Sequence, residues 1–250
     1  TRAGVALGVA GGSDSDTLEF VTIASTGNIT DFGNLTDARK TSGACGSLTR
    51  GLHGGGTDPS LSNIIDYITI ASAGNSTDFG DLGQARYSAS SNSASSSTRG
   101  IIAGGATAPD GSASNVNTIT HITIASTSND TDFGDLTDAR RVVASASSPT
   151  RTVFQGGVAS TGTSNVRDII DYVTTASTGN AQDFGDLVSA KRDHSGGSSA
   201  VRAMSAGSTG NSNAVDYITI ASTGNATDFG NLSVARALYS GALSNGHGGI

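Results

Sequence analysis

A block of about fifty residues recurs along this 250-residue chain, and an internal repeat of this length constrains the fold more than any single residue does. Each copy carries Asp-Phe-Gly, then Asp or Asn, then Leu, beginning at Asp31, Asp78, Asp132, Asp183 and Asp228. Successive copies are 47, 54, 51 and 45 residues apart. The 22 residues after Asp228 and the 31 residues up to the first copy make a further period of 53. The sequence therefore holds five units and begins in the middle of one.

Each unit predicts four short β-strands. In the fourth unit, small and β-branched residues indicate strands over 142–147, 150–157 and 168–175, and a fourth strand contains 183–187. A Gly-Asn turn at 177–180 separates the last two strands. Gly makes up 35 of 250 residues and no apolar face recurs at helical spacing, so we expect almost no helix. Four strands per unit and five units predict an all-β, five-bladed β-propeller that occupies residues 1–250 as one domain.

The two ends of the chain predict how this ring closes. Residues 237–244 match a first strand, and residues 5–12 match a second strand. We expect the last blade to take its inner strand from the C-terminus and its outer strands from the N-terminus, which leaves few free edges. Since the chain starts without Met, we also expect it to be a processed product, a fragment or the ordered part of a longer protein.

Recurring side chains suggest how the blades pack. The Phe of each Asp-Phe-Gly copy should fill the space between adjacent blades as a wedge. The glycine after it should allow a bulge or a close backbone approach. His121 stands where the other units have an aromatic residue, so we favour packing over ligand binding for it. The first strands are rich in Ala, Gly and Ser, which lets them approach a narrow axis, and Cys45 among them should be a small buried side chain. The wedge residues are Phe32, Phe79, Phe133, Phe184 and Phe229.

A cation also recurs near the end of each unit, at Arg39, Arg86, Arg140, Lys191 and Arg236. Two interpretations stay open: a basic ring that holds an anion, or a structural cation that pairs with carbonyls or with a carboxylate such as the Asp before each Phe. We favour the structural role because an Asp recurs with the same regularity.

The pattern resembles the kelch repeat. A basic residue enters the unit, a small-residue strand follows, Gly-Gly ends the next strand at 11–12, 55–56, 104–105 and 156–157, and aromatic residues mark the third and fourth strands. Phe stands where kelch repeats carry Trp, and the fifth doublet is Gly207-Ser208. The motif Thr-Ile-Ala-Ser-Thr-Gly-Asn is similar to motifs of kelch-like arrays in virion proteins of tailed bacteriophages. That resemblance implies a fibre, an appendage or a surface decoration of the virion, outside the cell.

The sequence gives little sign of catalytic chemistry. Asp-Phe-Gly comes five times without the other kinase motifs, and there is no nucleophile elbow, no zinc motif and no cysteine pair. We expect no enzyme, no cofactor and no metal. Asp14 and Asp16 could hold a calcium ion, but we favour a solvated loop for these two residues. A net charge of −7 argues against nucleic-acid binding, and no apolar run is long enough for membrane insertion. Four sequons, at Asn28, Asn75, Asn129 and Asn225, are explained by the turn, which favours Asn.

Candidate binding residues lie in the loops between the second and third strands of each unit, which differ most in length and sequence. Strand alternation places these loops on the same face as the blade-to-blade connections. Their side chains can hydrogen-bond sugar hydroxyls, although Trp is absent and no aromatic platform is expected. The candidate ligand-binding residues are Asp14, Asp16, Asp58, Asp110, Asn115, Asn117, Asn165, Arg167, Asn211 and Asn213.

Two function classes follow. A host-recognition module would bind a host cell-surface glycan or receptor through this loop face, with homo-oligomerisation as a way to raise avidity. A structural or decoration protein would instead bind other virion subunits and need no external ligand. We favour host recognition because the variation lies in the loops while the blades stay nearly uniform.

Overall fold

The structure is a computed structural model, which describes residues 2–6, 9–10, 12–89, 94–108, 114–159 and 165–236. Every regular element in these ranges is a β-strand, which confirms the all-β prediction. Within the same ranges the chain has no helix with the length and hydrophobicity needed to cross a bilayer.

Five larger antiparallel sheets follow one another along the chain. Three of them have four strands and two have three in the described ranges. The first sheet contains β1 (Arg2–Ala6), β4 (Thr17–Thr22) and β5 (Thr30–Asn34). The second contains β6 (Gly43–Gly46), β7 (Arg50–Gly54), β10 (Ile64–Thr69) and β11 (Thr77–Asp81). The third contains β12 (Arg99–Ala103), β13 (Thr118–Thr123) and β14 (Thr131–Asp135).

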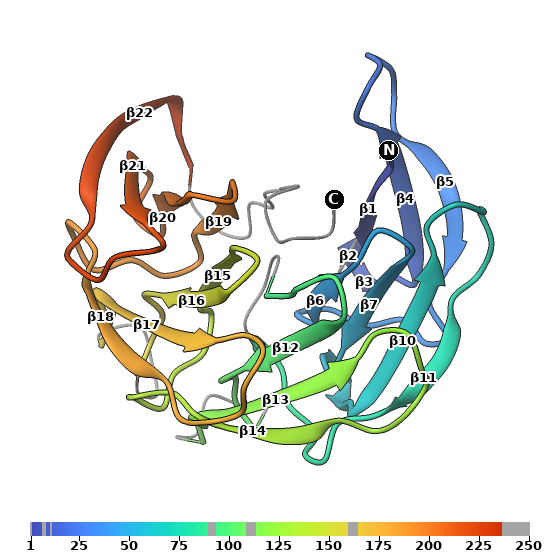
Figure 1. Cartoon of the computed structure of the whole chain (residues 1–250). Coiled ribbons are helices and arrows are strands. Elements are labelled where there is room, and N and C mark those ends of the chain that lie inside the picture. The colour runs from blue at the N-terminus through green and yellow to red at the C-terminus, as the bar shows by residue number, and fades with distance from the viewer. Residues whose placement is uncertain are drawn as a thin grey trace.

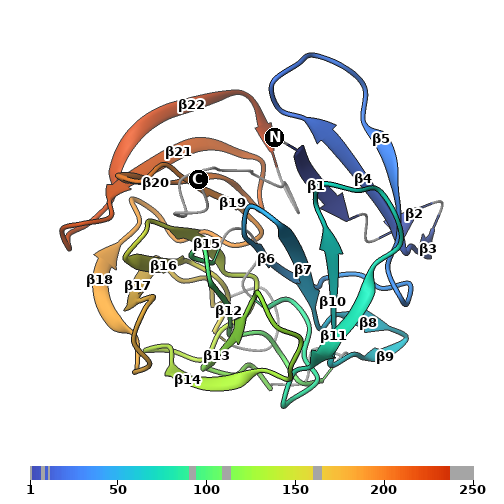
Figure 2. The same ribbon diagram turned by 45° about the vertical axis from the view of Figure 1, so that its right-hand side comes forward.

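The last two sheets repeat the same order. The fourth contains β15 (Ala144–Ser147), β16 (Arg151–Gln155), β17 (Ile169–Thr174) and β18 (Gln182–Asp186). The fifth contains β19 (Ser195–Ser198), β20 (Arg202–Ser208), β21 (Ser212–Thr219) and β22 (Thr227–Arg236). Two short ribbons complete the set, β2 (Val9–Ala10) with β3 (Ser13–Asp14) and β8 (Thr57–Asp58) with β9 (Ser60–Leu61). In Figure 2 the β8–β9 ribbon lies beside the end of the β7–β10 pair.

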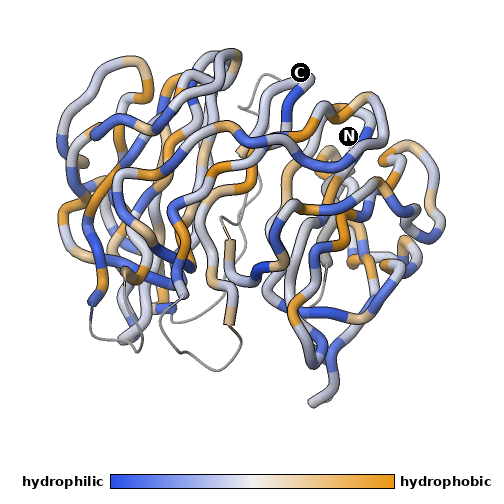
Figure 3. The backbone as a smooth tube through the Cα atoms, turned by 90° about the horizontal axis from the view of Figure 1, so that it is seen from below, coloured by the Kyte–Doolittle hydropathy of each residue, from blue (hydrophilic) through white to orange (hydrophobic). Residues whose placement is uncertain are grey.

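The sheets form a propeller-like arrangement. Figure 1 shows them in sequence order around an arc, from the first sheet at the right to the fifth at the upper left. The second to fifth sheets are four successive blades, and the first adds three strands of the same antiparallel kind. The predicted closing strand at 237–244 lies outside the described residues. Figure 3 shows hydrophobic and hydrophilic segments alternating along the strands, as expected for sheets that pack on their neighbours.

The second strand of the first unit differs from its prediction at 5–12. It is β1, which starts at Arg2 and pairs with β4, Ala3 opposite Val21 and Ala6 opposite Leu18. This register puts Arg2 where the other units start their second strand with Arg50, Arg99, Arg151 and Arg202. A recurrent arginine therefore marks the start of the second strand in all five units.

Large aromatic side chains fill the space between neighbouring sheets, as predicted, at four of five positions. Phe32, Phe79, Phe133 and Phe184 are 2–3% exposed. Each stacks edge-on against the third-strand aromatic of its own unit, at 5.7–5.8 Å between ring centroids. His121 takes part in this stacking with Phe133, so its predicted packing role is confirmed. The prediction is wrong for Phe229, which is 54% exposed because no described residue covers that face of the fifth sheet.

Glycine after each wedge residue is required by a close backbone contact. At Gly185, φ is +141° and an added Cβ would lie 2.6 Å from the carbonyl carbon of Gly224 in the next sheet. A register shift in the third and fourth strand pair, such as the one between Ile170 and Asp171, accompanies this glycine. The predicted bulge and close approach are thus confirmed here and at the equivalent Gly33, Gly80 and Gly134; at Gly230 nothing lies within 4 Å in the described structure.

The inner strands meet through small side chains, as predicted. The Ser95 amide donates to Ser147 Oγ at 3.1 Å, and the Ser147 amide donates to Ser198 Oγ at 3.2 Å. Cys45 is buried against Gly100, where an added Cβ would lie 2.5 Å from the sulfur. Burial raises the pKa of the Cys45 thiol to about 12, so this cysteine is an inert packing residue.

The recurring cations join neighbouring sheets, so the structural interpretation holds at four positions, although the predicted carboxylate is wrong. Arg39 pairs with Asp66 at 2.6 Å, Arg140 with Asp171 at 2.7 Å and Lys191 with Asp216 at 3.0 Å, all almost completely buried. These carboxylates come from the third strand of the next unit. The Asp before each Phe is exposed. At Asp31, Asp78 and Asp228 it accepts a hydrogen bond from the backbone amide two residues further on, as Asp78 does from Gly80 at 3.2 Å.

Candidate functional site

The variable loops and the blade-to-blade connections lie on one face, which we call the loop face. The connections, which we call crossovers, pair directly with the loops: Lys40 with Thr57, Tyr87 with Ala106 and Arg141 with Val158. This confirms the predicted placement of the second-to-third strand loops. The opposite face carries the tight turns between the other strands.

Each crossover contains a residue with left-handed backbone geometry. Thr41, Ser88, Val142 and Asp193 have φ between 50° and 57°, a conformation that costs free energy in any residue with a Cβ and most in a β-branched one. Hydrogen bonds hold these residues in place. The Ser88 amide donates to the Thr41 carbonyl at 2.8 Å, and the Val142 amide donates to the Ser88 carbonyl at 2.9 Å. The loop face therefore rests on crossovers that are fixed to one another.

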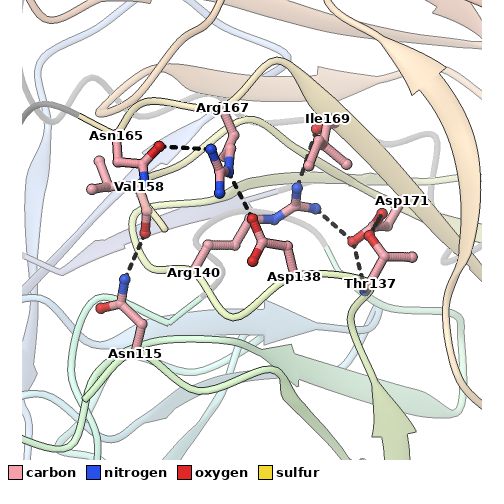
Figure 4. Close-up of polar contacts among 9 residues, drawn as sticks. All are labelled: Asn115, Thr137, Asp138, Arg140, Val158, Asn165, Arg167, Ile169 and Asp171. Carbon is pink, nitrogen blue, oxygen red and sulfur yellow. Dashed lines mark hydrogen bonds and ion pairs between the residues drawn. The ribbon is translucent and has the colours of Figure 1, made fainter. Parts of the chain in front are cut away.

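The best-connected part of the loop face lies between the third and fourth sheets (Figure 4). Asn115 donates from Nδ2 to the Val158 carbonyl at 2.7 Å, and Arg141 donates from Nη1 to Asn115 Oδ1 at 3.0 Å. Arg167 donates from Nη1 to Asn165 Oδ1 at 2.6 Å and pairs through Nε with Asp138 Oδ2 at 2.7 Å. Three of the predicted residues, Asn115, Asn165 and Arg167, thus belong to one polar cluster.

A buried ion pair supports this cluster from below. Asp171 accepts from Arg140 Nη2 at 2.7 Å and from Thr137 Oγ1 at 2.5 Å. Burial is the main influence on both groups: it lowers the pKa of the Arg140 guanidinium and raises the pKa of the Asp171 carboxyl. The charge of each partner opposes the shift of the other. The loop residues above are therefore anchored to a rigid base.

A second polar contact occupies the corresponding place in the first unit. Asp14 accepts from Lys40 Nζ at 2.8 and 3.2 Å, and this ion pair joins the first loop to the first crossover. Register places Asp14 and Asn115 at the same position of their units, three residues before the third strand. Asp16 contributes its carbonyl to the Leu35 amide at 2.7 Å. No group of three His, Cys, Asp or Glu side chains suited to a metal occurs in the described ranges.

The other predicted residues are spread around the face rather than gathered. Asp58 is exposed at the end of β8, and the Asn117 carbonyl accepts from the Leu136 amide at 2.7 Å. Asn211 is exposed with φ of 62°, and Asn213 is exposed in β21. Asp110 lies outside the described residues. The structure therefore brings together part of the predicted set, at the third and fourth units.

Two groups of residues were missed from the sequence. Lys40, Asp138 and Arg141 complete the polar contacts of the loop face, and the signal for two of them was a second polar residue directly after the recurring cation. The buried acids of the third strand were the other omission. Their signal is an acid before the third-strand aromatic, which occurs at Glu19, Asp66, Asp171 and Asp216.

The turn asparagines have a structural role between units, which the turn preference alone did not predict. Asn75, Asn129, Asn180 and Asn225 each accept, through Oδ1, from a backbone amide of the preceding unit at 3.0–3.1 Å. The amide donors are those of Asn34, Asp81, Asp135 and Asp186. These side chains hold neighbouring sheets together and are not part of the loop face.

Chemically, the cluster around Asn115 and Arg167 presents amide groups, guanidinium groups and one carboxylate from two units. Such groups donate and accept hydrogen bonds in fixed directions, which suits a polyhydroxylated or charged ligand. Because the residues are already hydrogen-bonded to one another, a ligand would meet side chains whose orientation is set before binding.

The fold and this face define an all-β, propeller-like protein with polar loops on one side. No protein family model matches the chain, and a search of curated proteins finds no match. Among solved structures, the chain is similar to YjhT, with a TM-score of 0.71 over 92% of this chain and 85% of that chain. At 10% sequence identity, this similarity shows the fold alone.

Proposed function

We propose that this chain is a non-enzymatic host-recognition module of a tailed-phage virion, exposed outside the cell, which binds a host surface glycan or receptor through the loop face. The observation that supports the proposal most is the polar cluster of Asn115, Asn165 and Arg167. Loops of different sequence in two units are fixed into one surface there, on blades that are otherwise nearly uniform. Binding proteins commonly vary loops on a constant scaffold in this way.

The finer description of the fold is also a proposal: a five-bladed, kelch-like ring whose first sheet receives its inner strand from 237–244. The five Asp-Phe-Gly copies support it. The first sheet also has three described strands, whereas each four-stranded sheet has a further inner strand of small residues. The kelch and phage resemblance rests on the sequence motifs.

The test is binding of the labelled protein to candidate host cells and to their isolated surface polysaccharide. We expect saturable binding by the native chain and at least tenfold weaker binding by an Asn165→Ala/Arg167→Ala variant, since truncation of a few central contacts commonly costs at least about 1.4 kcal/mol. Leu48→Ser, an exposed position on the opposite face, is the matched control and should bind normally. Release of reducing sugar in the same assay would contradict the non-enzymatic assignment.

The alternative is a structural or decoration protein of the virion. The exposed apolar side chains Phe229 and Val234 on the fifth sheet favour it, because such residues often mark contacts with another surface. No binding to host material by any variant, together with tight association with other virion subunits, would establish this alternative.

A further inference from the structure

A set of three side-chain positions recurs just below the loop face, where one sheet meets the next. The first is the fifth residue of a second strand, as Ala103 is in β12. The second is the crossover residue directly after the one with left-handed geometry, as Val143 is after Val142. The third is the fourth residue of the second strand in the following sheet, as Phe154 is in β16. Ala103, Val143 and Phe154 are 0% exposed in one apolar cluster, so the three positions belong to one packed region.

The contact between the second and third sheets fills these positions with small or apolar residues as well. An added Cβ at Gly54 would lie 2.7 Å from Ile102 Cδ1, so the first and third positions are adjacent. Ala89, at the second position, lies in the same apolar cluster as Ile102. Two successive contacts between sheets therefore close this region without a polar side chain.

The contact between the fourth and fifth sheets has a polar residue at all three positions. They are Gln155 in β16, His194 after the left-handed Asp193, and Ser205 in β20, which we call the polar triplet. These three residues are 1%, 4% and 0% exposed. All three positions change together at one contact while their burial is retained, which indicates that the three side chains act together.

Backbone contacts place the polar triplet on the two sides of one interface. An added Cβ at the residue after Gln155 would lie 2.8 Å from His194 Cε1. Gly196, which pairs with Ser205 within the fifth sheet, lies against the fourth sheet: an added Cβ there would be 2.7 Å from the Ser145 carbonyl oxygen. The fourth sheet therefore contributes Gln155, and the chain of the fifth unit contributes His194 and Ser205.

Each member of the polar triplet has a buried side-chain atom that finds no hydrogen-bond partner among the described residues. These atoms are Gln155 Nε2, His194 Nδ1 and Nε2, and Ser205 Oγ. A buried polar group without a partner destabilises the folded state, and native proteins rarely leave one unpaired. Four such atoms at three neighbouring positions are explained more simply by one shared partner than by four separate defects.

The polar triplet also leaves room for a partner. Ser205 carries a hydroxymethyl group at the position where Phe154 carries a phenyl ring, so the third position is far less filled than its equivalent. A small buried space with two to four polar groups around it is the usual place of an ordered water molecule.

The partner has to donate and accept hydrogen bonds at once. Burial, followed by the charges of Lys191 and Arg140, lowers the pKa of His194 to about 3, so its imidazole is neutral at neutral pH. A neutral imidazole has one nitrogen that donates and one that accepts, whereas Gln155 Nε2 only donates. A halide ion would leave the accepting nitrogen unpaired, and a metal cation would meet an amide nitrogen that has no lone pair to offer. Water satisfies both kinds of group.

We propose that the polar triplet binds one internal water molecule between the fourth and fifth sheets. The water accepts from Gln155 Nε2, donates to the unprotonated nitrogen of His194 and bonds the hydroxyl of Ser205, which gives it the roughly three partners typical of buried water. The two contacts with apolar residues at these positions stay dry. The site lies between two sheets whose four strands are all described, and it is independent of the proposed function.

A high-resolution crystal structure of the native protein tests the site directly. We expect one water peak within about 2.7–3.2 Å of a nitrogen or oxygen atom of at least two triplet members. A crystal soaked in sodium bromide should show no anomalous signal at this place. A bromide peak there would assign the site to an anion, and triplet side chains that bond one another with no peak between them would remove the site. Either result overturns the proposal.

Oxygen-17 magnetic relaxation dispersion, which counts long-lived internal waters, tests the site in solution. Gln155→Ala/His194→Val/Ser205→Phe copies the residues of the neighbouring contact, and we expect it to hold one water fewer than the native protein. His121→Tyr, which copies the aromatic residue of other units, is the matched control and should keep the native count. Ser205→Val, a smaller replacement, should also lose the water and serves if the triple variant fails to fold. An unchanged count in the folded variants overturns the proposal.

Discussion

Neighbouring sheets are joined by a repeated set of contacts, each of which we call a seam. Two seams of the same geometry differ in whether the recurring cation meets a buried carboxylate, and the comparison shows what holds the blades together. Between the third and fourth sheets, Arg140 meets the carboxylate of Asp171, which Thr137 also binds. Between the second and third sheets, Arg86 meets the hydroxyl of Thr120 at 2.6 Å instead, and further donates to the carbonyls of Thr118 and Ile102. The cation keeps its place without a buried carboxylate.

The second of these seams also changes at two other positions. Gly83 stands where Thr137 supports Asp171, and Asp130 comes from the next turn to accept from the Gly83 amide at 2.8 Å. Burial lowers the pKa of Arg86 to about 10, and the nearby charge of Asp130 opposes that shift. Near Arg86, the carboxylate of Asp130 thus partly supplies the negative charge that the buried Asp171 supplies to Arg140. The difference teaches that the seam needs acceptors for the guanidinium, whereas the position of the compensating charge can move.

The largest effect should follow from removing the interior carboxylate. Asp171→Ala leaves Arg140 buried and unpaired, and we expect the free energy of unfolding to fall by about 3–5 kcal/mol. Urea denaturation followed by circular dichroism measures it. Asp183→Ala, which removes the exposed Asp before Phe184, is the control and should change the free energy by less than about 0.5 kcal/mol. Equal effects of the two replacements would mean that the ion pair carries no special weight.

A buried histidine provides the next prediction, because the crossovers after these sheets differ at one residue. His194 occupies the place of Val143, and neither of its ring nitrogens has a hydrogen-bond partner among the described residues. Burial, followed by the charges of Lys191 and Arg140, lowers the pKa of His194 to about 3. The unfolded chain therefore binds a proton below pH 6.5 that the folded chain refuses, so stability is complete above that pH and falls below it.

We expect His194 to account for a loss of about 2 kcal/mol between pH 6.5 and 4.5. In His194→Val, which copies the residue of the neighbouring seam, that part of the loss should disappear. Unfolding free energies at both pH values measure the difference. His53, whose pKa burial lowers to about 4, adds its own loss in both proteins and serves as the internal reference. An unchanged pH slope in the variant would show that His194 is not buried as a neutral group.

Converting one seam into the other should have a smaller, stabilising effect. Gly83→Thr with Thr120→Asp gives Arg86 the same partners that Arg140 has, and we expect a gain of about 1–2 kcal/mol in unfolding free energy. Thr120→Asp alone should gain less, because Gly83 offers no hydroxyl to the new carboxylate. Thermal and urea unfolding of both variants give the comparison, and a destabilised double variant would show that the two seams are not interchangeable.

The smallest effect concerns the loop face between the third and fourth sheets. Arg167 and Asp138 are about one-third exposed, so Arg167→Ala should lower the unfolding free energy by less than about 1 kcal/mol. The same measurement on Arg140→Ala should give a several-fold larger loss. A large effect of Arg167→Ala would assign the loop cluster a role in stability and weaken its use as a binding surface.

Much of the fold follows from the sequence because the repeat reports the same local rules several times. The four strands of the fourth unit occur at β15 to β18 within a few residues of their predicted bounds. The wedge role of Phe184 and the close approach at Gly185 also follow, since a large residue and a side-chain-free residue in fixed order leave few alternatives. Phe229 differs because its environment depends on another unit, not on its own.

Partners across a seam were the harder part to predict. The sequence shows that a cation recurs, but acids recur at two positions, before the Phe in all five units and before the third-strand aromatic in four of them. Only the three-dimensional register selects Asp171 over Asp183 for Arg140. Likewise, loop composition identifies Asn115 and Arg167 as candidates but cannot show that they share a cluster while Asn211 stands apart. Spatial grouping of loops is set by the stacking of the sheets, which local patterns do not contain.

The uniform docking of Asn75, Asn129, Asn180 and Asn225 on the preceding unit has a genetic consequence. At these four described contacts the turn of one unit meets the outer strand of the preceding unit in the same way, so this contact does not depend on which two units are neighbours. Duplication or loss of a whole unit by recombination would preserve the turn contact, although the buried partners of the recurring cation differ from unit to unit. The loops between the second and third strands can then be exchanged between units. Such a gene can change the loop face quickly while the turn contacts between sheets stay the same.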